Sequence, residues 1–242
     1  MKSIGWLRVP LFGLLAFLYL PILVLAVMSF NSSDLPFVWE GFTFDWYTVL
    51  LENEAVLNGL RNTLIVAVIS TIGATTLGTL LAIGITRYSK SAWLESLALS
   101  PAIVPDLALA IGLLAMFTSF NAMLGLETVI YSHIVFGLAI VAAVVRGRLV
   151  EVDSSLEEAA LDLGDSGFGA FWRVTVPSLR PAILSGALLV FTLSLDEFVI
   201  AFFTTGPSAP TLPIVIYSMV RFGVTPEINA LATLVMMFSF IT

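Results

Sequence analysis

The sequence predicts an all-α membrane protein with six transmembrane helices and with both chain ends in the cytoplasm. The first observation is composition, because 59% of the 242 residues are hydrophobic, 11% are charged and none is cysteine. Such a composition is typical of a chain surrounded by lipid. The second observation is a series of apolar runs long enough to cross about 30 Å of hydrocarbon. The third is the uneven distribution of Lys and Arg between these runs.

Six apolar runs are expected to form the spans. The first, Val9–Phe30, is long for the apolar core of a signal peptide and contains Pro21. We therefore favour a retained span over the alternative, a cleaved signal peptide. The last starts near Ile228 and falls short of the ~20 residues needed to cross, so we expect the end of this helix and a short cytoplasmic tail to be missing from this sequence. The four runs between them are Thr63–Thr86, Ser96–Phe120, Thr128–Val145 and Ala182–Phe203.

The basic residues set the expected orientation. If the spans alternate, two of the ten Lys and Arg residues, Arg61 and Arg221, fall on one side and eight fall on the other. The eight are Lys2, Arg8, Arg87, Lys90, Arg146, Arg148, Arg173 and Arg180. Because basic loops stay in the cytoplasm, the N terminus and the polar segment 147–180 are predicted to be cytoplasmic. The acidic loop after the first span is then outside.

Small residues and prolines predict how two of the spans are shaped. Ala74, Gly78 and Ala82 lie four residues apart, a spacing that lets a neighbouring helix approach closely. The alternative is that small residues are simply common in membrane helices. Pro101 and Pro105 each remove a helix hydrogen bond, so we expect the third span to be broken or kinked.

Several function classes are excluded by the residues. Ten Lys and Arg spread over the chain cannot form the basic face of a nucleic-acid-binding protein. Neither Lys2 nor Lys90 follows a glycine-rich run, so the chain lacks a phosphate-binding GxxxxGK[ST] loop and is not expected to hydrolyse ATP itself. We assign no catalytic residue, metal site or bound cofactor. His133 is expected to be hydrogen-bonded inside the bundle, with a proton relay as the alternative.

The polar segment 147–180 interrupts two strongly apolar regions. Asp153–Ser155 can cap a helix whose first turn carries two glutamates, which is favourable at the positive end of the helix dipole. Gly164 supplies a left-handed or hinge position that ends this helix. A second short helix is expected around Phe168–Trp172 and is predicted to stop at Pro177. Apolar side chains with an acidic rim favour insertion into a groove of a partner, and an amphipathic segment lying on the membrane is the alternative.

The spacing within this segment resembles a known family. Glu158-Ala159-Ala160 is followed by three residues, Gly164, nine residues and then Val174-x-Val176-Pro177. This is similar to the EAA signature of ABC-importer permeases, EAA–x3–G–x9–I–x–L–P, with Val in place of Ile and of Leu. The resemblance implies a type I ABC importer permease (MetI-like) fold. It also implies that Glu158, Ala159, Ala160, Gly164 and Pro177 couple the chain to a cytoplasmic ATPase subunit.

Further motifs resemble the spermidine/putrescine permeases, in particular the second permease subunit of such systems, over essentially the whole chain. These motifs are Phe30–Ser33, Phe191–Phe198, Thr205–Pro207 and Thr225–Thr233. The sequence departs from that family at Asp196-Glu197, where the family has two aspartates.

Three carboxylates, Asp106, Asp196 and Glu197, fall within predicted spans. An unpaired charge there costs at least ~2.5–3.5 kcal/mol, so such groups normally face a protein interior or an aqueous path. With no Lys or Arg in the same spans, a cationic substrate can be the missing partner, as a polyamine would be. The alternative is a structural role at helix breaks. Adjacent helical residues point about 100° apart, so we expect one of Asp196 and Glu197 to face the path.

The resemblance implies a single permease domain, residues 1–242, of an ATP-driven polyamine importer in the bacterial cytoplasmic (inner) membrane. Its implied partners are a second homologous permease, two ATP-binding subunits that carry ATP and Mg, and an extracytoplasmic polyamine-binding protein. One alternative is an ABC permease for another small solute such as ferric iron or thiamine. A second is an ion-gradient-driven transporter, which leaves the spacing from Glu158 to Pro177 unexplained.

Overall fold

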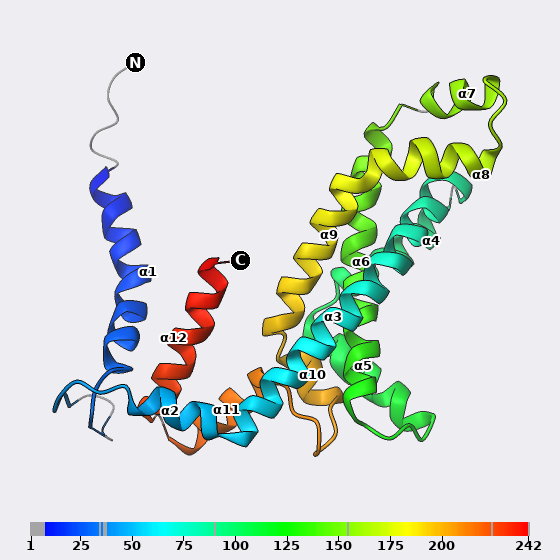
Figure 1. The fold of residues 1–242 in the computed structure, drawn as a ribbon. Helices are drawn as coiled ribbons and strands as arrows, with labels where there is room; N and C mark the ends of the chain where they lie inside the picture. The colour runs from blue at the N-terminus through cyan, green and yellow to red at the C-terminus, as the bar shows by residue number, and fades with distance from the viewer. Residues whose placement is uncertain are drawn as a thin grey trace. The chain divides into compact units, whose positions relative to one another are not determined.

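The computed structural model describes residues 8–33, 35, 38–89, 91–153, 155–223 and 225–241. Outside the described residues lie Lys2, Lys90, Ser154 and Thr242. Within the described ranges the regular elements are helices, and β pairing is confined to one isolated bridge between Asn31 and Phe42. Figure 1 shows these helices in chain order. The prediction of an all-α protein is therefore confirmed.

Several helices have the length and composition of membrane spans. In the described chain four helices pass this test, and a bent pair of helices makes a fifth candidate. The four are Arg8–Met28, Glu54–Tyr88, Leu126–Glu151 and Gly167–Asp196. The helix nearest the C terminus, α12 (Pro226–Ile241), is apolar but has 16 residues. These helices are those of a multi-pass membrane protein.

The chain divides into two compact units, residues 1–58 with 215–242 and residues 59–214. In the first unit, α12 packs against both α1 (Arg8–Met28) and α2 (Asp45–Glu52). Asn53 joins the end of α2 to the start of α12, because its side-chain amide donates a 2.7 Å hydrogen bond to Glu227. No residue of α1 is buried. An apolar helix so exposed needs lipid or another protein around it.

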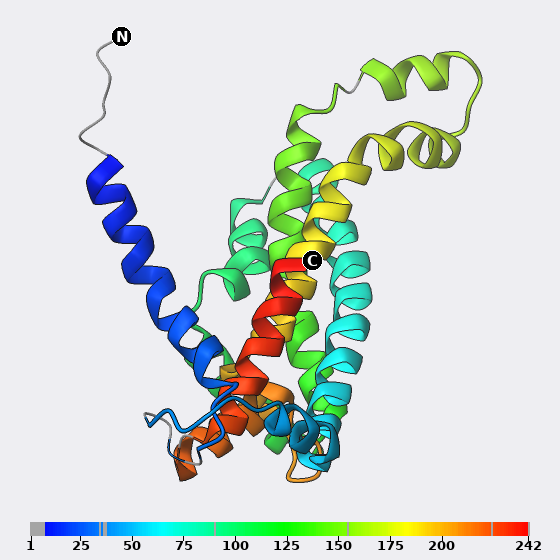
Figure 2. The ribbon, with the colours of Figure 1, turned by 60° about the vertical axis from the view of Figure 1, so that its left-hand side comes forward.

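The remaining helices are mostly those of the second unit (Figure 2). In chain order they are α3 (Glu54–Ile83), η2 (Gly84–Tyr88), α4 (Ala92–Leu99), η3 (Ser100–Ala102), α5 (Asp106–Ser119), α6 (Leu126–Glu151), α7 (Ser155–Asp162), α8 (Gly167–Ala170), η4 (Phe171–Thr175), α9 (Val176–Asp196), α10 (Val199–Thr204) and α11 (Leu212–Phe222).

The core of the second unit lies where α6 packs against α9 and α3. Small residues allow this approach: a Cβ atom added to Gly78 would lie 2.6 Å from the carbonyl oxygen of Leu138. Ala74 and Ala82, one helical turn to either side, are completely buried. The predicted small-residue stripe on α3 is therefore confirmed as a helix contact, which is how membrane helices pack closely.

The third predicted span is broken as expected. The helices Ala92–Ala102 and Asp106–Ser119 meet at an angle of 99°. Pro105 stands immediately before α5 with an extended ψ of 135°. Proline has no N–H to donate and disfavours helical geometry in the residue before it, so the chain leaves one helix and starts another here.

The fifth predicted span differs in position from the helix observed. The helical segment runs from Gly167 to Asp196 rather than from Ala182 to Phe203, and α10 follows as a separate helix. The prediction that Pro177 stops a helix is wrong. Pro177 lies inside this continuous helical segment, directly after the π-turn η4, which changes the hydrogen-bond spacing just before it.

Candidate functional site

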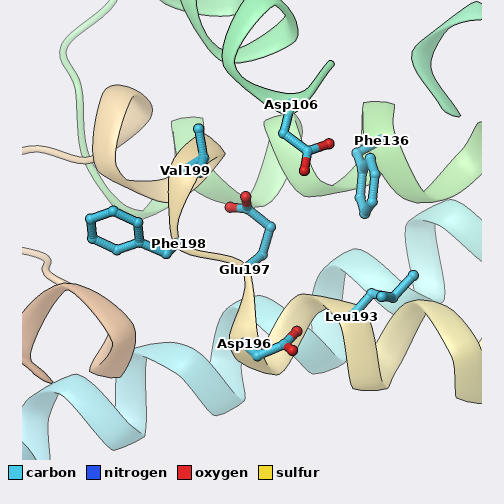
Figure 3. A pocket seen from close by; sticks show the side chains of 7 residues that line it. All are labelled: Asp106, Phe136, Leu193, Asp196, Glu197, Phe198 and Val199. Carbon is cyan, nitrogen blue, oxygen red and sulfur yellow. The ribbon is translucent and has the colours of Figure 1, made fainter. Parts of the chain in front are cut away.

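An open pocket of about 320 Å³ lies in the second unit, beside the gap between α9 and α10. It is lined by Asp106, Phe136, Leu193, Asp196, Glu197, Phe198 and Val199 (Figure 3). These side chains come from the start of α5, the middle of α6, the end of α9 and the start of α10. The fold thus gathers the three carboxylates that the sequence singled out around one space.

Glu197 has a structural task at this place. It adopts an extended conformation with ψ of 113°, which ends α9. Its carboxylate accepts hydrogen bonds of 2.9 Å from the backbone N–H groups of Ile200 and Ala201. The first N–H groups of a helix have no partner within the helix, so this carboxylate caps α10.

A buried polar chain lies behind Glu197. The His133 side chain, 2% exposed, places Nε2 3.6 Å from a Glu197 oxygen, and the Glu197 side chain is 9% exposed. On the other edge of the ring, Nδ1 lies 2.7 Å from the Ser194 hydroxyl, which is 3.3 Å from the Ser70 hydroxyl. The prediction that His133 is hydrogen-bonded inside the bundle is confirmed. Ser70 and Ser194 carry no signal in the sequence, because serines are common in membrane helices.

Asp106 and Asp196 differ from Glu197 in being exposed. Among the described residues neither has a side-chain hydrogen bond or an ion pair. Asp106 stands in the first turn of α5, where the helix dipole favours a negative charge. Figure 3 shows the Asp196 and Glu197 side chains leaving the chain in different directions. The pocket therefore offers two uncommitted carboxylates beside aromatic rings, a combination that suits an organic cation.

The segment after α6 forms a helical hairpin that lies beyond the ends of α6 and α9 (Figures 1 and 2). Gly164 has a φ of +89° and ends α7, as predicted. The N–H groups of Gly164 and Asp165 donate to Leu161 at 2.9 Å and Ala160 at 3.0 Å, which is the Schellman arrangement. At the other end Asp153 accepts a 2.9 Å hydrogen bond from the Ser155 N–H. This bond lowers the pKa of the Asp153 carboxyl.

Several large apolar side chains of this hairpin are exposed. Leu163 is 90% exposed, and the rings of Phe168 and Trp172 lie edge to face with centroids 6.3 Å apart. Glu158 and Ala159 are also exposed. A surface with such protruding apolar side chains is characteristic of a contact with a partner or a membrane.

The inner side of the hairpin is attached through Glu157. Its carboxylate lies 2.6 Å from the Arg87 guanidinium and accepts a 2.7 Å hydrogen bond from the Thr175 hydroxyl. The sequence motif begins one residue later, at Glu158, and indicates no partner for Glu157. No spacing rule connects these three positions, and only the fold brings them together.

Comparisons with known proteins identify the family. The model of the family "Binding-protein-dependent transport system inner membrane component" matches residues 74–242. The chain belongs to this family. It is therefore a membrane component of a binding-protein-dependent transport system, which confirms the prediction of a transport subunit rather than an ATPase.

Two curated relatives are similar along most of their length. The chain is 42% identical to the putrescine transport system permease protein PotI of Escherichia coli K12 over 229 residues, which cover 91% of this chain and 82% of PotI. It is 40% identical to the spermidine/putrescine transport system permease protein PotC of the same strain over 228 residues, or 93% of this chain and 86% of PotC. The resemblance to this permease family is thus confirmed.

Solved structures support the fold. A bacterial ABC transporter involved in the import of alginate contains a chain that matches with a TM-score of 0.76 at 18% identity, covering 95% of this chain and 87% of that one. The MetNI methionine ABC transporter in an inward-facing conformation matches with a TM-score of 0.62 at 15% identity, covering 81% of this chain and 92% of that one. The predicted ABC-importer permease fold is confirmed.

Proposed function

We propose that this chain is the permease subunit of an ATP-driven importer of spermidine or putrescine in the bacterial cytoplasmic membrane. The observation that carries the proposal is the convergence of Asp106, Asp196 and Glu197 on one pocket, whose lining among the described residues includes no Lys or Arg. The names of the relatives PotI and PotC point to the same substrates.

The chemistry of the pocket matches a polyamine. Asp106 and Asp196 are uncommitted, so they are the groups that meet the ammonium groups of the substrate. Glu197 contributes negative charge while it holds the start of α10 in place. The Phe136 and Phe198 rings supply apolar and cation–π contact for the methylene chain and the ammonium groups.

The whole chain, residues 1–242, is one permease domain with six spans and with both ends in the cytoplasm. One permease has too few spans to enclose a path, so the substrate passes at the interface with a second homologous permease. Two ATP-binding subunits carry ATP and Mg, and an extracytoplasmic protein delivers the polyamine.

Residues 147–180 couple this domain to the ATPase. Gly164 gives the hairpin its turn. The helix that enters the cleft of the ATP-binding subunit carries Glu158, Ala159 and Ala160. Pro177 lies where the hairpin enters α9. Closure of the ATP-binding pair moves this hairpin and opens the cavity between the permeases to the outside. Release of the substrate inward follows hydrolysis.

Uptake of labelled spermidine and putrescine tests the proposal, in cells that lack their own importers and express the whole system. A carboxylate that contacts an ammonium group contributes about 1.5 kcal/mol, so Asp106→Asn or Asp196→Asn should raise the KM about tenfold. The control is Glu52→Gln, which removes one negative charge at the exposed end of α2, outside the set of residues that line the pocket. Equal KM values in the pocket variants and the control would contradict the substrate assignment.

The two alternatives give different results in the same assay. If the chain serves another small solute, labelled polyamine does not enter and ferric iron or thiamine does. If an ion gradient drives it, a protonophore stops uptake although ATP is present.

A further inference from the structure

Arg87, Glu157 and Thr175 form a cluster that joins three elements of the second unit. The Arg87 guanidinium lies 2.6 Å from the Glu157 carboxylate and 3.4 Å from the Thr175 hydroxyl. The same hydroxyl donates to Glu157 at 2.7 Å. Each member thus contacts the other two, and the cluster links the π-turn η2 that ends α3 to α7 and to the π-turn η4 that precedes α9.

The cluster is partly shielded from water. The Arg87 and Glu157 side chains are 25% and 24% exposed, and Thr175 is buried. Shielding and a third partner make such a pair stronger than an isolated surface ion pair, which contributes about 0–1 kcal/mol. Arg148–Glu151 is a pair of the weaker kind, because both side chains lie on one helix and are largely exposed.

The attachment of α7 depends on this cluster. No residue of α7 is buried, and the helix packs against α8 and η4 of its own hairpin. In the described part of the chain Glu157 makes the ion pair that connects α7 to α3. A neighbouring residue, Glu158, is exposed and stays available for a partner.

We propose that the Arg87–Glu157–Thr175 cluster is a mechanical link that transmits movement of α7 to α3 and α9 during transport. Glu157 is a positioning residue that acts on the substrate path through the helices it connects. This inference rests on the proposed function, in which an ATP-binding subunit moves the hairpin. It assigns transmission to Glu157 and docking to the exposed side that carries Glu158.

Reconstituted vesicles that contain the complete importer test the link, with transported substrate and hydrolysed ATP measured in the same sample. In Arg87→Gln and Glu157→Gln the ATP-binding subunits should still co-purify and hydrolyse ATP. The number of substrate molecules moved per ATP should fall about tenfold. The exchange of the two residues, Arg87→Glu with Glu157→Arg, should restore most of the ratio, because a threonine hydroxyl can donate or accept.

A matched control is present in the same unit. Arg146 and Glu95 also lie 2.6 Å apart, with exposures of 35% and 37%, and they connect α6 to α4 without contacting α7. Glu95→Gln should therefore leave the transport ratio unchanged. The link is refuted if Glu95→Gln lowers the ratio as much as Glu157→Gln, or if neither variant changes it. It is also refuted if Glu157→Gln and the exchanged pair both lose the ATP-binding subunits, because the cluster then supports docking itself.

Failure of the proposed function would look different. If the unaltered chain never co-purifies with an ATP-binding subunit, or moves no polyamine while ATP is hydrolysed, the function assignment fails irrespective of the cluster. If the unaltered importer works and the variants keep its transport ratio, only the link fails.

Discussion

Removal of the Glu197 carboxylate should destabilise the protein, whereas removal of the adjacent Asp196 carboxylate should not. Glu197 accepts hydrogen bonds from the N–H groups of Ile200 and Ala201, and both of these residues are completely buried. A buried donor left without an acceptor costs about 1–3 kcal/mol. Glu197→Ala leaves two such donors without an acceptor, beside a pocket that is open to water. It should therefore lower the free energy of unfolding by about 2–4 kcal/mol. Glu197→Gln keeps one acceptor oxygen and should lose about half as much.

The effect can be measured on the purified chain in detergent. A change of 1 kcal/mol shifts the midpoint of thermal unfolding by about 2–4 °C in a domain of this size, so Glu197→Ala should lower it by about 4–16 °C. Hydrogen exchange at the amides of Ile200 and Ala201 should accelerate in the same variant. Asp196→Ala removes an exposed group with no side-chain hydrogen bond and should change neither quantity. Equal melting temperatures for both variants would refute the capping role of Glu197.

Three other outcomes follow from the same contacts. Gly78→Ala should lower the free energy of unfolding by about 1–3 kcal/mol, because the added Cβ atom would collide with a backbone carbonyl of α6. The control is Gly112→Ala, where no atom lies within 4 Å of the added Cβ, and it should be neutral or stabilising in the same melting assay. Ser194→Ala should leave His133 Nδ1 without this 2.7 Å hydrogen bond, so the nuclear magnetic resonance chemical shift of the ring nitrogen Nδ1 should change relative to the unaltered chain. The pKa of Asp153 is lowered, so its hydrogen bond to Ser155 stabilises the start of α7 above the ordinary aspartate pKa and is lost as the pH falls through the lowered pKa. Protection of the Ser155 amide from hydrogen exchange should therefore fall in that acidic range. In Asp153→Asn the same protection should be independent of pH.

The hairpin formed by α7 and α8 shows what local patterns can predict. The end of α7 at Gly164 is predictable because glycine adopts the left-handed conformation that commonly follows the last residue of a helix. The break at Pro105 was predicted for a similar reason, since the missing N–H is a property of the residue itself. The continuation of the helix through Pro177 is not predictable from the residue itself, because no local rule encodes the π-turn that precedes it.

The contacts of the two candidate sites depend on long-range packing. The residue types indicated that Asp106, Asp196 and Glu197 face a protein interior or an aqueous path, with one of Asp196 and Glu197 facing the path. That all three line one pocket is a product of the fold. The capping of α10 by Glu197 was not predictable, because Glu197 was expected inside a continuous span. The partnership of Glu157 with Arg87 was missed because the residues belong to different helices and no motif contains both.

The most direct test of the central claim is ATP-driven accumulation of polyamine in vesicles that contain the complete importer and its binding protein. We predict that labelled spermidine or putrescine accumulates only when ATP is present on the side of the ATP-binding subunits. The double variant Asp106→Asn with Asp196→Asn should raise the polyamine concentration that gives half-maximal uptake. Accumulation of neither polyamine by a complex that assembles and hydrolyses ATP would contradict the claim.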